Sequence, residues 1–326
     1  MGTSENKKDN PIKRLLNNPN FRSYSGIILV IIVVCVFMSF RSANFMTLNN
    51  IKNILRQISV YGILACGMAF AMMTGGIDLT VGSTAGVSGA IVAKFVTEMG
   101  VPLAAAILIA IVVGGLIGLM DGTVIAYTGI PPFIMSLGVQ IMLRGVCYLI
   151  TAGKPIGNLP ESFQFLGLGN ILGVPTPIYF MVITFVIVAV ILAKTSFGRS
   201  VYAVGGNYEA AHHSGINAKR VLMYSYMISG LCAALAGVIL AARNASAQPT
   251  GGNTFETEAI AACAMGGVSF SGGKGAVPGI FFGALLMGII NNAMNLMYID
   301  SYWQQVVKGI IIVGSVLYSI YNGRKK

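Results

Sequence analysis

Residues 194–220 read KTSFGRSVYAVGGNYEAAHHSGINAKR and form the longest interior stretch that could not lie within a lipid bilayer. Apolar segments flank this stretch on both sides. It carries four basic residues, one acid and the only two histidines of the chain, His212 and His213. Because Lys and Arg bias the loops between membrane spans toward the cytoplasm, the stretch is predicted to be a cytoplasmic loop.

The middle of this loop, residues 206–216 (GNYEAAHHSGI), predicts a short helix. Glu209 would lie in its first turn, where a negative charge suits the helix dipole, and Gly215 would end it. A short exposed helix on a cytoplasmic loop is a docking point for a soluble partner. An ordinary solvated loop is the alternative, and this stretch alone does not decide between the two.

The composition indicates an integral membrane protein. Of 326 residues, 55% are hydrophobic and only 10% are charged, whereas soluble domains carry about 25% charged residues. The net charge of +11 would suggest nucleic acid in a soluble protein. Here the basic residues fall at the two ends and in the central loop, which is the pattern of membrane topology. We therefore expect lipid, and no nucleic acid, around this chain.

The cysteines predict neither disulfides nor a metal site. They are scattered through apolar runs without metal-ligand spacing, so they are expected to be small buried hydrophobic residues. No cleavable signal peptide is expected, because the first twenty-odd residues are polar and basic. The five cysteines are Cys35, Cys66, Cys147, Cys232 and Cys263.

The fold is predicted to be an all-α integral membrane protein with about ten transmembrane helices, both termini cytoplasmic. A bilayer needs about 20 apolar residues per helix, and several predicted spans are shorter. Residues 1–23 would be a cytoplasmic tail, residues 24–321 the transmembrane domain and residues 322–326 a cytoplasmic end. The predicted spans are residues 24–40, a span ending near residue 74, then 81–96, 103–127, 133–150, 178–193, 221–242, 255–265, 276–296 and 302–321. The span at 255–265 is short enough to be re-entrant.

Two glycine-rich stretches suggest broken helices and an internal repeat. Residues 75–82 (GGIDLTVG) and 266–273 (GGVSFSGG) share two glycines, a β-branched residue, an apolar residue, a hydroxyl residue and a final glycine. They lie six predicted spans apart, so the two copies would be parallel, relating the first four spans to the last four. The alternative is that glycine-rich turns in any membrane protein look alike. If the repeat is real, both turns lie near the cytoplasmic end of a pathway.

No sequence motif indicates an enzyme. The segment SGGKG at residues 271–275 lacks the spacing and the following Ser or Thr of a phosphate-binding loop. Neither HExxH nor GxSxG occurs. The chain is therefore expected to bind no cofactor and no metal of its own.

Charged residues within predicted spans raise the question of ion coupling. Asp78 lies between the first glycine-rich break and the following span. It could cap that helix or line a pathway, and the sequence leaves both open. The other such residues are expected to lie near an interface or to pair with one another. They are Asp121, Arg144, Glu256, Glu258 and Lys308.

Uncharged polar residues within the spans suggest a pathway for a neutral, polyhydroxylated solute. Asn291 and Asn295 are four residues apart and share one helix face. Gln140 lies in another span, and Trp303 and Gln304 open the last one. Amides and aromatic rings bind sugars through hydrogen bonds and stacking without a counter-charge. Hydrogen bonding between helices is the alternative role for these residues.

Six stretches together resemble the ribose-type sugar permeases of ABC importers. The likeness runs in order from about residue 45 to residue 321. One departure is His212-His213, where members more often carry Arg or Thr. The stretches are residues 75–83 (GGIDLTVGS), 205–216 (GGNYEAAHHSGI), 246–249 (SAQP), 259–273 (AIAACAMGGVSFSGG), 291–296 (NNAMNL) and 302–309 (YWQQVVKG).

This resemblance implies partners and a location. It implies ATPase subunits that hydrolyse ATP on the cytoplasmic side and dock on the Glu-Ala-Ala…Gly motif, here Glu209, Ala210, Ala211 and Gly215. A soluble sugar-binding protein would deliver the solute outside, into a cavity between two permeases that form a homodimer or a heterodimer. The location implied is the bacterial cytoplasmic (inner) membrane.

The resemblance leaves the sugar open and has rivals. One rival is an ion-coupled secondary transporter of a small polar solute, with Asp78 as the ion site. Another is a membrane scaffold or receptor without transport.

Overall fold

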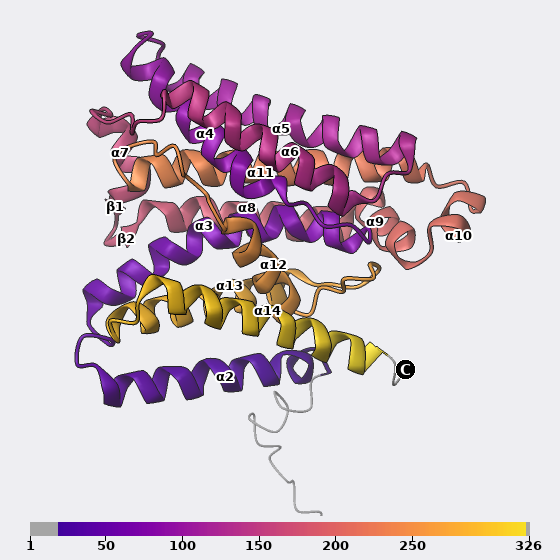
Figure 1. Ribbon diagram of the computed structural model, residues 1–326. Helices are drawn as coiled ribbons and strands as arrows, with labels where there is room; N and C mark the ends of the chain where they lie inside the picture. The colour runs from indigo at the N-terminus through magenta and orange to yellow at the C-terminus, as the bar shows by residue number, and fades with distance from the viewer. Residues whose placement is uncertain (1–18, 324–326) are drawn as a thin grey trace, which may run out of the picture.

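The computed structural model describes residues 19–323, and these residues are almost entirely helical, as predicted. Figure 1 shows the long helices running roughly side by side across the molecule. One two-residue antiparallel strand pair, β1 (Asn170–Ile171) with β2 (Val174–Pro175), interrupts this pattern. The helices are α2 (Pro19–Arg41), α3 (Leu48–Met73), α4 (Thr80–Thr97), α5 (Leu103–Thr128), α6 (Pro132–Thr151), α7 (Glu161–Leu168), α8 (Thr176–Lys194), α9 (Ser196–Gly206), α10 (Tyr208–His213), α11 (Ala218–Arg243), α12 (Phe255–Met265), α13 (Val277–Leu296) and α14 (Ser301–Gly323).

Each predicted span coincides with one of these helices, but not all of them meet the length and hydropathy of a membrane crossing. Within the described part of the chain, seven helices do: α2, α3, α5, α6, α8, α11 and α13. The other three predicted spans correspond to α4, α12 and α14. The predicted tail and C-terminal end fall largely outside the described residues, which leave out 1–18 and 324–326.

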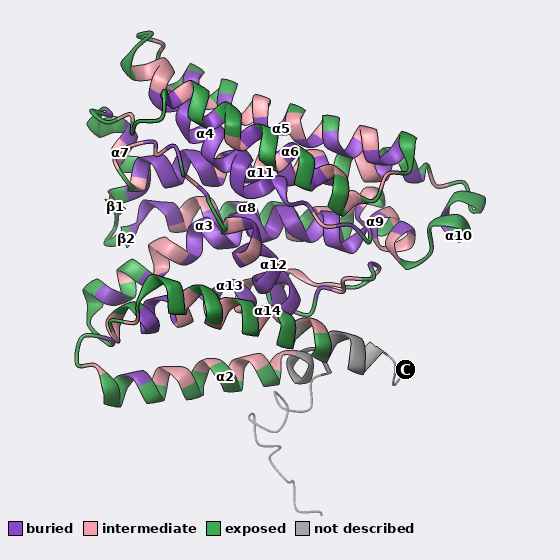
Figure 2. Ribbon diagram, in the orientation of Figure 1, coloured by how far each residue is buried: buried purple, intermediate pink, exposed green. Residues whose placement is uncertain are grey.

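The core of the molecule lies around α3 and α11. Figure 2 shows these two helices buried along most of their length, while α2 and α14 are largely exposed. α11 packs against α5, α3 and α4, and α3 packs in addition against α13, α12 and α8. Because other helices surround most of α3 and α11, the part of α3 from Ile58 onward and most of α11 after Arg220 are largely apolar on every side rather than amphipathic.

Glycines allow α5 and α11 to cross at close range. A Cβ atom on Gly118 would overlap the backbone oxygen of Tyr226, and one on Gly230 would overlap the backbone oxygen of Gly114. Small residues at such crossings let two helix backbones approach within a membrane. The crossing fixes the position of α11 relative to α5. It also determines the surroundings of Asp121, which lies about one turn beyond Gly118.

The two glycine-rich turns end their helices in the same way and lie against each other. Gly75 after α3 and Gly267 after α12 both adopt the left-handed conformation, with φ of +87° and +81°, as the residue after a helix C-cap often does. This equivalence is shifted by one position from the sequence pattern, which aligns Gly75 with Gly266. The N–H of Gly273 donates a hydrogen bond to the backbone oxygen of Met73 (2.9 Å), so the second turn is attached to the end of α3. The parallel repeat itself stays a prediction.

Two segments that the sequence suggested were irregular contain helices. The loop before α10 folds into α9, whose buried residues include Gly198, Val201 and Val204. The segment between α6 and α8 contains α7 and the β1–β2 hairpin. In Figure 1, α10 and the C-terminal end of α14 lie toward one end of the helix array, and α7 and the hairpin lie at the other.

Candidate functional site

The short helix α10 is a projecting element, and its sequence explains why it forms. Asn207 caps it, because its side-chain oxygen accepts a hydrogen bond from the N–H of Ala210 (2.9 Å). Glu209 lies exposed in the first turn, and Gly215 ends the segment with φ of +84°. Of the predicted docking residues, Ala211 is the one that faces inward, with 5% of its surface exposed. The predicted helix is confirmed, and Glu209, Ala210 and Gly215 are available to a partner.

α10 is joined to the body of the protein through α9, with Asn207 alone between the two helices. The C-terminal end of α9 packs tightly against both glycine-rich turns. A Cβ atom on Gly205 would overlap the backbone oxygen of Met73 and crowd the N–H of Gly273. Tyr202 Oη also donates a hydrogen bond to the backbone oxygen of Gly275 (2.9 Å). We call these contacts of Tyr202 and Gly205 with Met73, Gly273 and Gly275 the glycine interlock.

A second candidate region surrounds the two glutamates of α12, both of which are buried. Gln140 Nε2 of α6 donates a hydrogen bond to Glu256 Oε1 (2.9 Å). Asn291 Nδ2 of α13 donates one to Glu258 Oε2 (3.2 Å), and Lys308 of α14 forms an ion pair with Glu258. Glu256 and Glu258 are two positions apart on α12, which corresponds to a rotation of about 200° around the helix axis. Their carboxylates therefore reach different neighbours. α12 is therefore connected by polar contacts to α6, α13 and α14.

Other polar groups extend this region toward both ends of α12. Arg144 Nη1 donates a hydrogen bond to the backbone oxygen of Gly251 (2.7 Å). Gln304 Nε2 donates one to Asn295 Oδ1 (2.9 Å), while Trp303 remains 66% exposed. We call Gln140, Glu256, Glu258, Asn291, Asn295, Gln304 and Lys308 the polar groove.

The structure places four of the six predicted pathway residues in the polar groove and leaves two, Trp303 and Asp78, outside it. Gln140, Asn291, Asn295 and Gln304 all belong to the polar groove. Asp78 makes none of these contacts. It is fully buried, and its Oδ1 accepts hydrogen bonds from the N–H and the hydroxyl of Thr80 (2.9 and 2.6 Å), so a structural role at the start of α4 is present.

The expectation for the remaining charged residues holds in part. Glu258 and Lys308 pair with each other, as expected. Asp121 is fully buried in α5, and neither carboxylate oxygen has a hydrogen-bond partner in the described chain, so the structure shows no pairing for this residue. Sequence reasoning missed that Glu256 and Glu258 connect α12 to three other helices, because two acids in an alanine-rich helix predict nothing about its neighbours.

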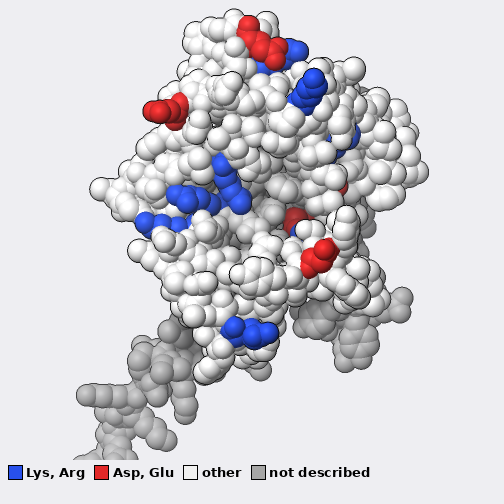
Figure 3. Space-filling view, turned by 60° about the vertical axis from the view of Figure 1, so that its left-hand side comes forward, with Lys and Arg blue, Asp and Glu red and all other residues white. Residues whose placement is uncertain are grey.

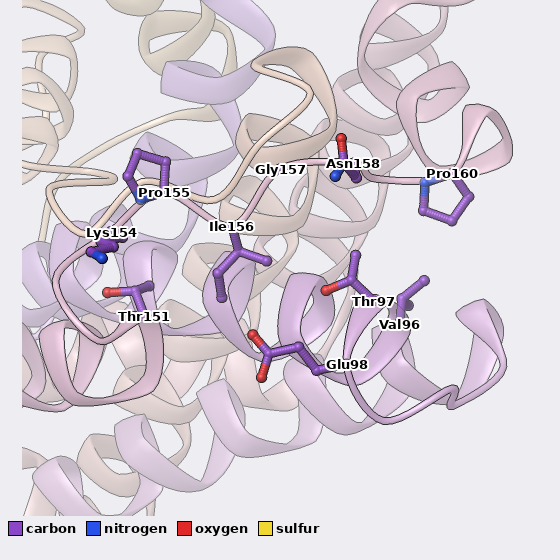
Figure 4. A pocket seen from close by; sticks show the side chains of 10 residues that line it. All are labelled: Val96, Thr97, Glu98, Thr151, Lys154, Pro155, Ile156, Gly157, Asn158 and Pro160. Atoms are coloured by element: carbon purple, nitrogen blue, oxygen red, sulfur yellow. The ribbon is translucent and has the colours of Figure 1, made fainter.

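One cavity lies away from both regions. It has a volume of about 660 Å³ and opens between the end of α4 and the segment after α6, where Glu98, Lys154 and Asn158 line it together with Pro155 and Pro160 (Figure 4). Two of its lining residues, Thr97 and Thr151, are the last residues of α4 and α6. The cavity therefore lies at the same end of the molecule as α7 (Figure 1). The cavity is thus at the end opposite α10.

Charged side chains are sparse on the surface. The space-filling view shows a few basic and acidic side chains scattered over a mostly uncharged face, with acidic atoms set back in a hollow near its middle (Figure 3). A surface of this kind faces lipid over most of its area. The protein is a multi-pass membrane protein.

Comparisons with known proteins give concordant matches. The chain is 40% identical over 309 residues to the ribose import permease protein RbsC of Haemophilus influenzae, covering 94% of both chains. It is 42% identical over 294 residues to RbsC of Bacillus subtilis, covering 90% of this chain and 91% of the relative. It is 36% identical over 293 residues to the D-allose transport system permease protein AlsC of Escherichia coli, covering 90% of both. No solved structure matches the chain.

These relatives confirm the resemblance drawn from the six sequence stretches. A family model described as "branched-chain amino acid transport system / permease component" matches residues 50–316, which contain α12 and α10 and most of the helix array. The chain belongs to this family of transport-system permease components.

Proposed function

We propose that this chain is the membrane permease subunit of an importer that takes up a simple sugar, ribose or a related monosaccharide. The observation that carries the proposal is the similarity, over about nine tenths of both chains, to permeases named for ribose and D-allose. The polar groove supports it, because amides and carboxylates at membrane depth suit a neutral solute with many hydroxyl groups.

The energy for import would come from separate ATPase subunits, and this chain would bind no cofactor of its own. The docking surface for the ATPase is α10, with Glu209, Ala210, Ala211 and Gly215. On this proposal α10 lies in the cytoplasm, as do both termini, and the protein resides in the bacterial inner membrane with ten spans, α4, α12 and α14 included. The placement of α10 and the end of α14 toward the same end of the array supports this orientation (Figure 1).

The polar groove would be completed by a second permease, identical or homologous. Gln140, Gln304 and Lys308 are only partly buried in the single chain, and lipid cannot satisfy the hydrogen bonds of such groups. A second copy facing the groove would cover them and enclose a path for the sugar between the two chains. Trp303, exposed near the opening residues of α14, would lie at one end of that path.

The solute would reach the path from a soluble sugar-binding protein on the outer side. The end of the molecule that carries α7, the hairpin and the 660 Å³ cavity is the outer end on the proposed orientation. The cavity offers a recess with one basic and one acidic residue, Lys154 and Glu98, at which a projecting side chain of that partner could be held.

Reconstitution tests the proposal. The full chain, its ATPase and its binding protein are placed in vesicles, and uptake of labelled ribose is measured with and without ATP. Import that requires all three proteins and ATP supports the proposal. ATP-independent accumulation driven by an ion gradient would instead establish the ion-coupled transporter. No uptake of any monosaccharide that the binding protein holds would leave only a scaffold or receptor.

A further inference from the structure

Two aspartates lie buried in the middle of the helix array without a compensating positive charge. Asp78, in the break between α3 and α4, and Asp121, in α5, are both fully buried. Thr80 satisfies one oxygen of Asp78. The second oxygen of Asp78 and both oxygens of Asp121 have no hydrogen-bond partner in the described chain.

A tyrosine from a third helix lies between them. Tyr226 of α11 is fully buried, and its hydroxyl also lacks a partner among the described residues. That hydroxyl touches Gly76, where a Cβ atom would collide with it, two residues before Asp78. The backbone oxygen and the Cβ atom of Tyr226 lie against Gly118 and Gly122, the glycines on either side of Asp121. The tyrosine therefore spans from the α3–α4 break to the turn of α5 that carries Asp121.

The same side of α11 adds two more buried hydroxyl groups. Ser225 and Ser229 are fully buried. The Ser229 hydroxyl is close enough to Asp78 to act on it as a hydrogen-bonding group, whereas the Ser225 hydroxyl has no partner in the described chain. Ser229 lies one turn beyond Tyr226 and beside Asp78. The titratable groups that act on one another here are Asp78, Asp121 and Tyr226, and no Lys, Arg or His among the described residues forms an ion pair with either aspartate.

A positive charge would stabilise such a buried group of carboxylate and hydroxyl oxygens. Burying a carboxylate without a partner costs far more than burying a neutral group, and two nearby carboxylates cannot both remain ionised alone. Oxygen ligands without thiolate or imidazole favour hard cations. Calcium takes six to eight oxygens, often from several carboxylates, which is more than two aspartates and a few hydroxyls supply. A small monovalent cation needs fewer ligands, and one such cation reduces the charge of the pair to that of a single carboxylate.

We propose that Asp78, Asp121 and Tyr226, with Ser229 beside them, form a buried site for one small monovalent cation, either a proton or Na⁺. The site joins the α3–α4 break to α5 and α11 through that cation. None of its residues belongs to the polar groove or to α10, so the proposal does not depend on sugar import or on the ATPase.

Binding and stability measurements on the purified full chain in lipid nanodiscs test this site. For Na⁺, the unfolding midpoint is followed as NaCl replaces choline chloride at constant ionic strength, and binding of radioactive Na⁺ is measured directly. For the proton, infrared spectroscopy follows the C=O stretch of a protonated carboxylic acid as the pH is varied in choline chloride. The variants are Asp78→Asn and Asp121→Asn, and the control is Asp300→Asn, an exposed residue at which Asn can still cap α14.

Three outcomes are distinguishable. A saturable rise of the midpoint with Na⁺ that Asp78→Asn and Asp121→Asn abolish, but Asp300→Asn keeps, assigns the site to Na⁺. A protonated-acid band near neutral pH that disappears in Asp121→Asn assigns it to a proton. If wild-type protein shows neither Na⁺ binding nor a protonated acid, the site holds only water and the proposal is overturned. The infrared and binding arms on wild type decide this even if a variant does not fold.

Discussion

The ion pair of Glu258 with Lys308 shows how strongly burial determines the contribution of one charged residue to stability. The carboxylate of Glu258 is 1% exposed and the side chain of Lys308 is 19% exposed. A second ion pair, Lys94 with Glu98, has the same chemistry but is much more exposed. Removing one member of a buried pair leaves an uncompensated charge, whereas an exposed pair contributes little.

We therefore predict that Lys308→Met lowers the free energy of unfolding by about 3–5 kcal/mol, while Lys94→Met changes it by at most about 1 kcal/mol. Unfolding in detergent by chemical denaturant measures both. The double variant Glu258→Gln with Lys308→Met should recover most of the loss, because position 258 then no longer carries an uncompensated buried charge. Equal effects of the two single variants would show that Glu258 is solvated in the protein.

Glu209 can be tested against a matched residue at the other end of the molecule. Glu209 and Glu161 are both exposed acids in the first turn of a short helix, α10 and α7 respectively. Glu209→Lys should lower ATP-dependent uptake at least about tenfold, corresponding to about 1.4 kcal/mol of lost docking energy. Glu161→Lys should leave ATPase association unchanged, since it lies away from the proposed docking surface. Co-purification of the ATPase with each variant measures this, and normal association of Glu209→Lys would contradict docking on α10.

The sequence identified the candidate residues better than it identified their contacts. Gln140, Asn291, Asn295 and Gln304 were singled out as amides within apolar runs, and they do lie in one polar region. Glu256 and Glu258, the partners of Gln140 and Asn291, could not be predicted because each contact joins two different helices whose relative positions the sequence does not define. Whether these residues contact a solute stays a prediction.

At the scale of elements, the glycine interlock places α9 between α10 and the turn that follows α12. α10 is joined to α9 through Asn207 and also packs against it. α9 in turn contacts the end of α3 and the turn after α12, mostly through backbone atoms, which cannot change rotamer. Discrete rearrangements of packed elements of this kind transmit conformational change. The contacts therefore suggest a route by which ATPase closure reaches the polar groove.

Two adjacent glycines provide the test of this route. A Cβ atom on Gly205 would overlap Met73, whereas one on Gly206 meets no atom within 4 Å. Gly205→Ala should therefore strain the interlock by about 1–3 kcal/mol and lower uptake severalfold while the ATPase still associates and hydrolyses ATP. Gly206→Ala should behave as wild type. The ratio of sugar imported to ATP hydrolysed is the measurement, and an unchanged ratio in Gly205→Ala would remove the interlock from the coupling route.

The positions of the helices were predictable, and two of the surface elements were not. Long apolar runs between polar segments located every helix of the array, because hydropathy depends on composition alone. α9 was missed because its buried face consists of Gly198, Val201 and Val204 within a segment that is polar elsewhere. The one-position shift that pairs Gly75 with Gly267 could not be predicted either, because only the backbone conformation shows which glycine follows the helix cap.

At the scale of the whole molecule, α14 is the helix whose packing is least complete. Its described contacts are mainly with α12, and Trp303, Val306, Ile310, Val313 and Leu317 form an exposed stripe along it. The spacing of three and four residues is that of a helix-packing seam. A second copy of the chain packed here would bury this stripe and, in the same contact, close the polar groove.

Cross-linking tests this arrangement. Ile310→Cys should form a disulfide-linked dimer in membranes on mild oxidation, because symmetry brings the same position of two copies close together near a twofold axis. Leu116→Cys, on the exposed face of α5, is the control and should remain monomeric on denaturing gels. Dimers from Leu116→Cys and none from Ile310→Cys would place the second copy against another face.

The short length of α12 has a consequence for the insulation of the membrane. Its 11 residues span about 16 Å, roughly half of the hydrocarbon thickness of about 30 Å. On the proposed ten-span topology, the glycine-rich turns after α3 and α12 would close part of the remaining distance, and the hydrogen bond from Gly273 to Met73 attaches the second turn to the end of α3. The resistance of the protein to ion leakage, and with it the voltage that the cell maintains across its envelope, would therefore depend at this point on how closely two loops fit together.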